Sequence, residues 1–494
     1  MNILTQIALN VNRPENPFTK AMRYVAEAIG QDELRILAAQ CGFVERLRNF
    51  DPAILVATYI DCTNNAKTFS IDYLHTCYNA AAAKSGYTAI SKTSFEKQLN
   101  KPAFKDFCRA VMEHVINRTG HLPLSASGDL AKSLMQRVHV NRVLITDGTE
   151  LKMVDTAGQR EEQAERCKGK AGTCGIKVHY TYDPLSGTFA CATVGSAVSS
   201  ETAEVPTEMI KDCLWLADAG YVSFDLFQKL QDNGARYLVR AKQNANPMVN
   251  GVRIYSTDFK LKETITESKP MKMNEFMAKH NLVGNDIFDF DVLLRPGLKS
   301  RFIKYFDPVK AIRRDGEDDF AYFYCNVSHE LLNVEAIRIG YHLRWAIECL
   351  GNKCTKQFNG LIETKIKKVD TEEAFVYLST TAHTLKSGVG QYLQQVLGQT
   401  LSSMKIQQRA GIFLKEIVDV MYYMFNSYYT LFGEDLSMNL CKMVTKRLKT
   451  LSDVFLGIAK KTKLSKISCF NKVRGKSFKV QLENFLSYLQ TCCS

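Results

Sequence analysis

The sequence has no Cys-x-x-Cys pair, although it contains 15 cysteines among its 494 residues. A structural zinc site needs ligands at close and regular spacing, and Cys167 and Cys174 have no partner Cys or His at such a spacing. The pattern excludes a zinc finger and predicts reduced, mostly buried thiols. The pair Cys492 and Cys493 is predicted to be an untethered tail.

Long apolar runs are also missing. The longest uncharged apolar stretch, roughly residues 420–433, is too short and too rich in Tyr to cross a bilayer core of about 30 Å. The first residues contain no early basic cluster and lack a secretory signal pattern. Internal repeats and low-complexity tracts are absent too. We therefore expect a cytoplasmic protein that makes no membrane contact.

Acidic residues are nearly absent from one window of a chain whose net charge is +13. Residues 441–480 hold twelve Lys or Arg and a single acid, Asp453, so this window alone carries +11. Such a local excess attracts polyanions, although a basic face can also be merely solvated. The window alone leaves both interpretations open, and a set of metal-binding carboxylates elsewhere in the chain would favour nucleic acid.

One short motif combines a phenol, a guanidinium and a carboxylate. Residues 341–348 read Tyr-His-Leu-Arg-Trp-Ala-Ile-Glu, and a regular helix places Tyr341, Arg344 and Glu348 on one face at steps of three and four. Apolar residues such as Ile347 can serve the core from other sides of the helix. The polar stripe is then free to meet a ligand, which we predict to be a phosphate backbone with its metal ions.

The spacing Tyr-x-x-Arg-x-x-x-Glu resembles the signature of the DDE transposases of bacterial insertion sequences, specifically the insertion-sequence-four family marked by Tyr, Arg, Glu and Lys. The resemblance covers most of the chain and implies two further carboxylates, each at the end of a strand. Asp147 closes the apolar run 142–146, and Asp218 follows the run 213–217. The order Asp, Asp, Glu is then complete with Glu348. A single Asp after a strand is usually a turn or cap residue, and Asp155 is the rival for the first position.

This resemblance implies a two-metal active site. Asp and Glu oxygens are the hard ligands that Mg²⁺ or Mn²⁺ prefers, and two ions roughly 3.5 to 4 Å apart can activate an attacking oxygen and stabilise a leaving oxygen. Asp147 is expected to bridge the two ions. Asp218 and Glu348 are expected to flank them.

Five further residues are candidates for DNA contact. Arg344 can bind a phosphate bidentately, and Tyr341 can donate to another phosphate oxygen. Trp345 is predicted either to offer an aromatic surface to an unstacked base or to pack in the core. Arg240 and Lys242 end a strand beside the expected cleft and either hold phosphate or are solvated.

The sequence departs from the family pattern at the signature Lys. The family places Lys seven positions after Glu348, where this chain has Thr355, whereas Lys353 and Lys356 stand five and eight positions on. We interpret this as a one-residue insertion and predict a π-bulge or break between Leu350 and Lys353. Such a bulge would return Lys356 to the signature face and make it, rather than Lys353, the candidate for the Lys role.

The order of elements predicts an α/β fold with a ribonuclease-H-like catalytic core. A strand before Asp147 is followed by a hairpin of 176–182 and 188–194, then by a strand before Asp218, a helix near 223–232 and a strand at 236–240. A β-rich insertion and helical flanks complete the fold. The predicted divisions are a helical DNA-end-binding domain at 1–135, the first part of the core at 136–245, the insertion at 246–325, the core helix with the catalytic Glu at 326–375, and a basic helical domain for dimerisation or DNA contact at 376–494.

The expected function is that of a cut-and-paste DNA transposase associated with the bacterial nucleoid. The resemblance implies binding to terminal inverted repeats, cleavage at the transposon ends through a hairpin intermediate, and joining of the 3′-hydroxyl ends to target DNA. It also implies a homodimer in a synaptic complex. The alternatives are a ribonuclease-H-like nuclease or resolvase, and a catalytically silent DNA-binding descendant.

Overall fold

The chain divides into two compact units. The computed structural model describes residues 17–44, 46–63, 69–119, 126–154, 165–169, 173–306, 320–361, 366, 368–397, 405–412, 414–415 and 418. The first unit takes its described residues from Met1–Gly128, Gly148–Ser199 and Glu348–Arg474, and the second from Asp129–Asp147 and Ser200–Ile347. The chain therefore passes from one unit to the other directly after Asp147 and again directly before Glu348.

Helices form the N-terminal part of the first unit, as the apolar spacing in this region predicts. Side chains of Asp51, Ser70 and Ser91 each accept a hydrogen bond from a backbone N–H in the first turn of the helix that follows, which explains where three of these helices begin. The helices are α2 Pro17–Ala28, α3 Gln31–Gln40, α4 Pro52–Cys62, α5 Ile71–Lys84, α6 Lys92–Leu99 and α7 Pro102–Arg118.

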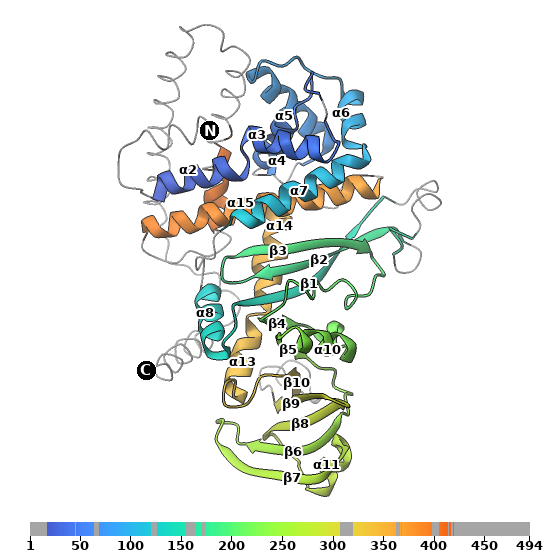
Figure 1. Ribbon diagram of the computed structural model, residues 1–494, viewed down its shortest axis with the longest axis vertical. Helices are drawn as coiled ribbons and strands as arrows, with labels where there is room; N and C mark the ends of the chain where they lie inside the picture. The colour runs from blue at the N-terminus through green and yellow to red at the C-terminus, as the bar shows by residue number, and fades with distance from the viewer. Residues whose placement is uncertain are drawn as a thin grey trace. The chain divides into compact units, whose positions relative to one another are not determined.

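A long helix, α15 Val369–Leu397, lies beside α2 and α7 in the same unit (Figure 1). Ion pairs join α15 to α7: Lys105 contacts Asp370 at 3.0 Å, and Arg109 contacts Glu373 at 3.0 Å. The middle of α15 is buried and carries polar side chains, including Lys386. A helix that is buried on most sides needs hydrogen-bond partners for such groups, and Lys386 has them in Thr63 and Phe358.

The first unit also contains the predicted hairpin. Strands β2 Gly175–Asp183 and β3 Thr188–Ser196 pair antiparallel, and the turn between them uses Gly187 at φ 69°. The second half of β1, Arg142–Lys152, is the neighbour of β2, and the N–H of Met153 just beyond it donates to the Cys174 carbonyl at 3.1 Å. The hairpin was predicted from turn residues, and the structure confirms it.

The second unit is built on a sheet whose strand order is β1-β4-β5-β10-β9-β8-β6-β7. The first half of β1 pairs parallel with β4 Cys213–Ala217, and β4 pairs parallel with β5 Arg236–Arg240. Helix α10 Phe224–Asp232 connects β4 to β5 and begins at its cap residue, Ser223. The predicted order of strand, hairpin, strand, helix and strand is therefore the observed order.

The remaining strands of the second unit occupy the region predicted to be a β-rich insertion, and they pair antiparallel. They are β6 Met248–Tyr255, β7 Leu261–Lys272, β8 Ile287–Arg295, β9 Leu298–Phe306 and β10 Phe320–Cys325, with the short helix α11 Met273–Lys279 after β7. Helix α8 Ala126–Val138 precedes β1, and helix α13 Val334–His342 follows β10.

Some predictions concern residues that the structure does not describe. The basic window 441–480, the pair Cys492 and Cys493, and the rival carboxylate Asp155 all lie outside the described residues. The described cysteines are free thiols and most are buried, as predicted. Within the described residues, no helix combines the length and the apolar character that crossing a membrane requires.

Candidate active site

Asp147 lies in the middle of β1, so the strand end predicted at this residue is wrong, because β1 continues to Lys152 along β2; Asp218 directly follows the parallel neighbour β4, as predicted. The register pairs Ile145 of β1 with Leu216 of β4, and two further steps along both strands bring Asp147 opposite Asp218. Adjacent strands lie about 4.8 Å apart, and partners in register point to the same face. Both aspartates are half-buried. The carboxyl ends of parallel strands are the usual place for ligands in α/β sheets, so this edge is a suitable location for a site.

The backbone around each aspartate is held by hydrogen bonds. Asp218 caps the 3₁₀ turn Ala219–Tyr221, and its Oδ1 accepts from the N–H of Gly220 at 2.8 Å. The indole N–H of Trp215, a fully buried core residue, donates to Thr146 Oγ1 at 2.9 Å. This second bond links β1 to β4 close to the two carboxylates.

Tyr221 is buried among acidic side chains of the second unit. Its side chain is 1% exposed, and its hydroxyl has no hydrogen-bond partner in the described part of the chain. Burial raises the pKa of the Tyr221 phenol well above its ordinary value, and Asp147, Glu201 and Asp218 raise it further, while Arg344 lowers it. The phenol of Tyr221 therefore lies within electrostatic reach of a cluster of three carboxylates and a guanidinium in this unit.

Glu201 is a member of this cluster that the sequence did not indicate. It lies in the loop between β3 and β4, in no recognisable motif, and it is half-buried. A Cβ atom on Gly220 would collide with the Glu201 carboxylate and would lie 3.1 Å from Asp218 Oδ1. Gly220 therefore allows Glu201 to approach the Asp218 turn closely.

Tyr341 and Arg344 also belong to this cluster. The hydroxyl of Tyr341 donates to the carbonyl oxygen of Ala217 at 3.3 Å, so its single proton is directed at the residue before Asp218. Burial raises the pKa of Tyr341, Arg344 and Arg240 lower it, and Asp218 raises it. Arg344 is 9% exposed, and its guanidinium lies 5.9 Å from the centre of the Tyr341 ring.

The signature helix is not a regular α-helix, which corrects the geometry assumed from the sequence. Backbone bonds from Leu343 to Gly340, from Arg344 to Tyr341 and onward to Ile347 run from residue i to i−3, as in a 3₁₀ turn. Side chains three apart eclipse one another in such a turn, which explains why Arg344 lies over Tyr341. The helix is wound more tightly at the end of α13, and the helix propensities of the residues in this segment do not predict this change.

A π-helix follows at Ile347–Asn352 and leads into α14 Lys353–Phe358. The predicted bulge is therefore confirmed, and it begins earlier than the Leu350–Lys353 interval proposed from the sequence. Glu348, Lys353 and Lys356 are exposed and lie in the first unit. Thr355, at the position where the family has Lys, is buried, and its hydroxyl donates to the Gly351 carbonyl at 2.8 Å.

The remaining predicted contact residues of the second unit differ in exposure. Trp345 is 38% exposed, so its environment differs from that of the core residue Trp215. Arg240 is half-buried beside Tyr341. Lys242 is exposed and lines a cavity of about 310 Å³ together with Asn244, Asn246 and Lys272.

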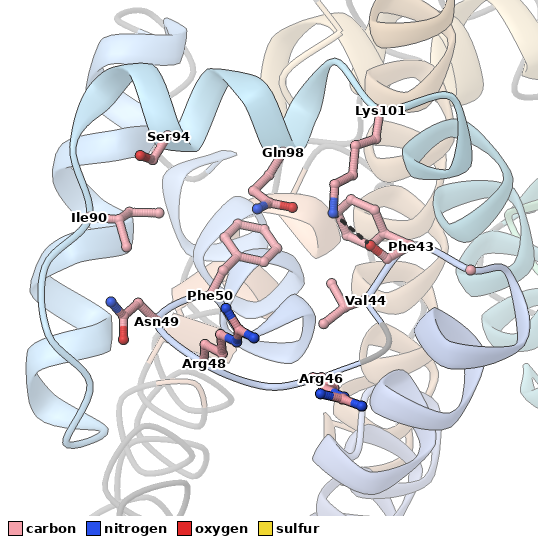
Figure 2. A pocket seen from close by; sticks show the side chains of 11 residues that line it. Phe43, Val44, Arg46, Arg48, Asn49, Phe50, Ile90, Ser94, Gln98 and Lys101 are labelled. Atoms are coloured by element: carbon pink, nitrogen blue, oxygen red, sulfur yellow. Dashed lines mark hydrogen bonds between the residues drawn. The ribbon is translucent and has the colours of Figure 1, made fainter.

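A second basic cavity lies in the N-terminal helical region and measures about 700 Å³. Figure 2 shows Arg46, Arg48 and Lys101 around its rim, with the rings of Phe43 and Phe50 behind them. Lys101 is held in place because its ammonium donates to the Phe43 carbonyl at 3.2 Å. The polar side chains Asn49, Ser94 and Gln98 also line the cavity. Its lining residues fall in two stretches of the chain, from Gly42 to Phe50 and from Ile90 to Lys101.

A family model described as the transposase DDE domain matches residues 139–385, which is half of the chain. The chain belongs to the DDE transposases of bacterial insertion sequences. This transposase is 21% identical over 402 residues to the transposase for insertion sequence element IS1151 of Clostridium perfringens, covering 75% of this chain and 81% of the relative. It is 24% identical over 214 residues to the transposase for insertion sequence element IS231B of Bacillus thuringiensis subsp. berliner, covering 43% of this chain and 42% of the relative.

A solved structure of the piggyBac transposase synaptic complex with hairpin DNA is also similar to this transposase. The similarity covers 88% of this chain and 86% of that chain, with 10% sequence identity and a TM-score of 0.44.

DDE transposases use divalent metal ions, and the donors of this transposase suit them. Asp147 and Asp218 supply hard carboxylate oxygens, and Oδ2 of Asp218 lies outside the cap bond that Oδ1 accepts. No group of three His, Cys, Asp or Glu side chains in the described ranges is arranged to hold a metal ion. A Mg²⁺ ion does not need three carboxylates, because water and phosphate oxygens can complete its coordination.

Proposed function

We propose that this protein is a cut-and-paste DNA transposase that cleaves DNA at transposon ends and joins the 3′-hydroxyl ends to target DNA. The observation that carries the proposal is the register of β1 and β4, which brings Asp147 opposite Asp218 just beyond the parallel pairing of the two strands. The chain belongs to the DDE transposases, whose name refers to two Asp and one Glu. We assign the Glu to Glu348.

In this proposal Asp147, Asp218 and Glu348 would hold two Mg²⁺ or Mn²⁺ ions. When bound, such ions make an attacking oxygen more acidic and stabilise the charge on the leaving oxygen of a phosphodiester. Arg344 would donate two parallel hydrogen bonds to a phosphate, and its contact with Tyr341 orients it. Tyr341 fixes the strand end before Asp218, and its hydroxyl can turn to a phosphate oxygen.

Several exposed groups would hold the DNA in the proposed site. Lys356, or Lys353 in its place, would contact phosphate as the signature Lys. Lys242 would contact the backbone from the cavity that it lines, and Arg240 would do so beside Tyr341. The exposed ring of Trp345 would receive an unpaired base at the cleaved end.

The wider architecture follows from the same proposal. We assign a ribonuclease-H-like core to 136–245 and 326–375, the β-rich insertion to 246–325, and a DNA-contact or dimerisation role to 376–494. The helical domain 1–135 would bind the transposon ends, and the basic cavity with Arg46, Arg48 and Lys101 supports this role because guanidinium and ammonium groups pair with phosphates.

The remaining parts of the proposal are a hairpin intermediate, a homodimeric synaptic complex and a cytoplasmic, nucleoid-associated location, where the DNA substrate is. Two other functions make different predictions. A ribonuclease-H-like nuclease or resolvase would cut DNA without joining it to a target. A silent descendant would bind ends without cutting them.

The chemistry is tested with purified protein, DNA carrying the flanking ends of its own element, and Mg²⁺. Asp147→Asn, Asp218→Asn and Glu348→Gln should each abolish strand cleavage and leave end binding largely intact, because affinity comes mainly from basic contacts. Asp232→Asn, an exposed carboxylate at the end of α10, is the matched control and should cleave normally. Normal cleavage by any of the three variants would remove that residue from the triad.

End binding is tested in the same assay with the exposed residues Arg46 and Arg48. The Arg46→Ala and Arg48→Ala variants should each weaken binding of the specific end by about tenfold, since a charge-assisted hydrogen bond contributes about 1.5 to 3 kcal/mol. Lys97→Ala, on α6 but outside the cavity lining, should bind as the wild type does. Equal losses in all three variants would indicate general electrostatic attraction instead of a defined contact.

A further inference from the structure

The loop between β3 and β4 brings Glu201 to the turn that follows Asp218. The position of Gly220 shows this most directly, because any side chain there would occupy the space taken by the Glu201 carboxylate. The same Cβ position lies 3.1 Å from Asp218 Oδ1, so the two carboxylates share the space around this glycine. A third carboxylate, that of Asp147, lies on the neighbouring strand β1, opposite Asp218 in the register.

Tyr221 gives an independent indication that a ligand belongs at this place. Its hydroxyl is buried and has no hydrogen-bond partner among the described residues. The carboxylates that act on this phenol are those of Asp147, Glu201 and Asp218. An unsatisfied buried hydroxyl costs about 1 to 3 kcal/mol, and an oxygen ligand or water that accepts its proton removes this cost.

We propose that Glu201 is a fourth carboxylate of the metal site and that the Tyr221 hydroxyl donates to an oxygen ligand brought there with the ions. This inference rests on the proposed function. Glu201 would act either as a direct ligand or through a bound water, and Tyr221 is a positioning residue.

A structural role for Glu201 makes a different prediction. Arg344 is a buried guanidinium close to the same phenol, and a carboxylate can serve mainly as its counter-ion. In that case loss of the Glu201 charge would lower the thermal stability and would leave the affinity for the metal unchanged. The two roles can therefore be separated by measuring both quantities on the same variants.

The experiment uses the full chain without DNA, and the probe is Mn²⁺, followed by its electron paramagnetic resonance signal. Glu201→Gln keeps the shape beside Gly220 and removes the charge, and we expect it to weaken Mn²⁺ binding by about tenfold, as loss of supporting groups around metals typically does. Glu208→Gln, an exposed residue of the same loop, is the control and should bind as the wild type does. An unchanged Mn²⁺ affinity in Glu201→Gln would overturn the proposal.

Tyr221→Phe tests the second half of the inference. Because the hydroxyl has no partner in the described structure, we expect this variant to melt at the same temperature as the wild type or higher, and to bind Mn²⁺ several-fold more weakly. A lower melting temperature with unchanged Mn²⁺ affinity would make Tyr221 a structural residue. Asp147→Asn separates this result from the proposed function. If this variant also binds Mn²⁺ normally, the proposed metal site itself is wrong. If only Asp147→Asn loses Mn²⁺ binding, the metal site stands and the proposed roles of Glu201 and Tyr221 are wrong.

Discussion

The side chain of Lys386, in the middle of α15, is fully buried. Its ammonium donates to Thr63 Oγ1 at 3.1 Å and to the Phe358 carbonyl at 2.6 Å. Burial lowers the pKa of Lys386 from 10.5 to about 7, and Asp61 partly opposes this shift. The neighbouring His383 is also buried, and its pKa falls to about 3, so it stays neutral and leaves Lys386 as the group that titrates.

The buried position of Lys386 predicts a dependence of stability on pH. Between pH 7 and 10.5 the unfolded chain holds a proton on Lys386 that the folded chain has released, so stability should rise with pH by about 1.4 kcal/mol per unit from this residue. Lys386→Met should remove that rise, and thermal melts at several pH values measure it. The exposed Lys415→Met is the control. An identical pH dependence in Lys386→Met and wild type would contradict the shift.

The position of a site residue could be predicted only where its neighbours in the sequence determine it. Asp218 follows the apolar run of β4, so its place at a strand end could be predicted from sequence, whereas Asp147 lies inside β1 because that strand continues beyond its apolar run. The position of Glu201 could not be predicted, because its approach to Gly220 depends on how the loop before β4 folds back, and no spacing encodes this. Tyr221 follows Asp218 closely in sequence, but only its burial reveals an unsatisfied hydroxyl.

Among the elements, the signature helix changes its winding twice. The 3₁₀-like turn at 343–347 rises further along the helix axis per residue than an α-helix does. The π-helix Ile347–Asn352 rises less per residue. The existence of the π-helix was predictable because the Lys spacing required one extra residue. The tight turn before it was not, since Tyr341 to Ile347 contains no residue that breaks a helix.

The π-helix is packed against the hairpin of the first unit. A Cβ atom on Gly351 would lie 3.2 Å from two atoms of the Phe189 ring and 3.4 Å from Tyr182. Phe189 is fully buried, and its ring stacks on Tyr180 with centres 4.3 Å apart, so it has little room to move. Glycine at 351 therefore allows the π-helix to approach β2 and β3.

Gly351→Ala tests this packing of the π-helix. Overpacking costs about 1 to 3 kcal/mol, and alanine regains up to about 1 kcal/mol of helix propensity, so we expect a net loss of about 1 kcal/mol in the free energy of unfolding. Denaturant unfolding measures it. In the background of Phe189→Leu, which removes the ring, the same change should cost less or nothing. A cost that is equal in both backgrounds would show that the ring is not the cause.

Across the chain as a whole, charge and catalytic groups are distributed unevenly. The chain carries +13, and the window 441–480 alone carries +11, so the rest of the protein is close to neutral. The two aspartates and Arg344 belong to one unit, whereas Glu348, Lys353 and Lys356 belong to the other. Sequence patterns predicted the elements of both units well, because each element depends on local periodicity. The division into units depends on contacts between distant segments, which local patterns do not contain.

The last prediction concerns the contribution of the basic window to DNA affinity. If residues 441–480 bind phosphates, deleting 441–494 should flatten the dependence of log affinity on log salt by about 0.9 for each phosphate that the window neutralises, for specific and unrelated DNA alike. Substituting Lys97 and Lys415, two exposed lysines outside the window, controls for a general change of charge. Apolar positions such as Leu448 and Leu451 suggest dimerisation as the competing role, so the oligomeric state is measured in parallel. A truncated protein that is monomeric and keeps the same salt slope per bound protomer would assign the window to dimerisation.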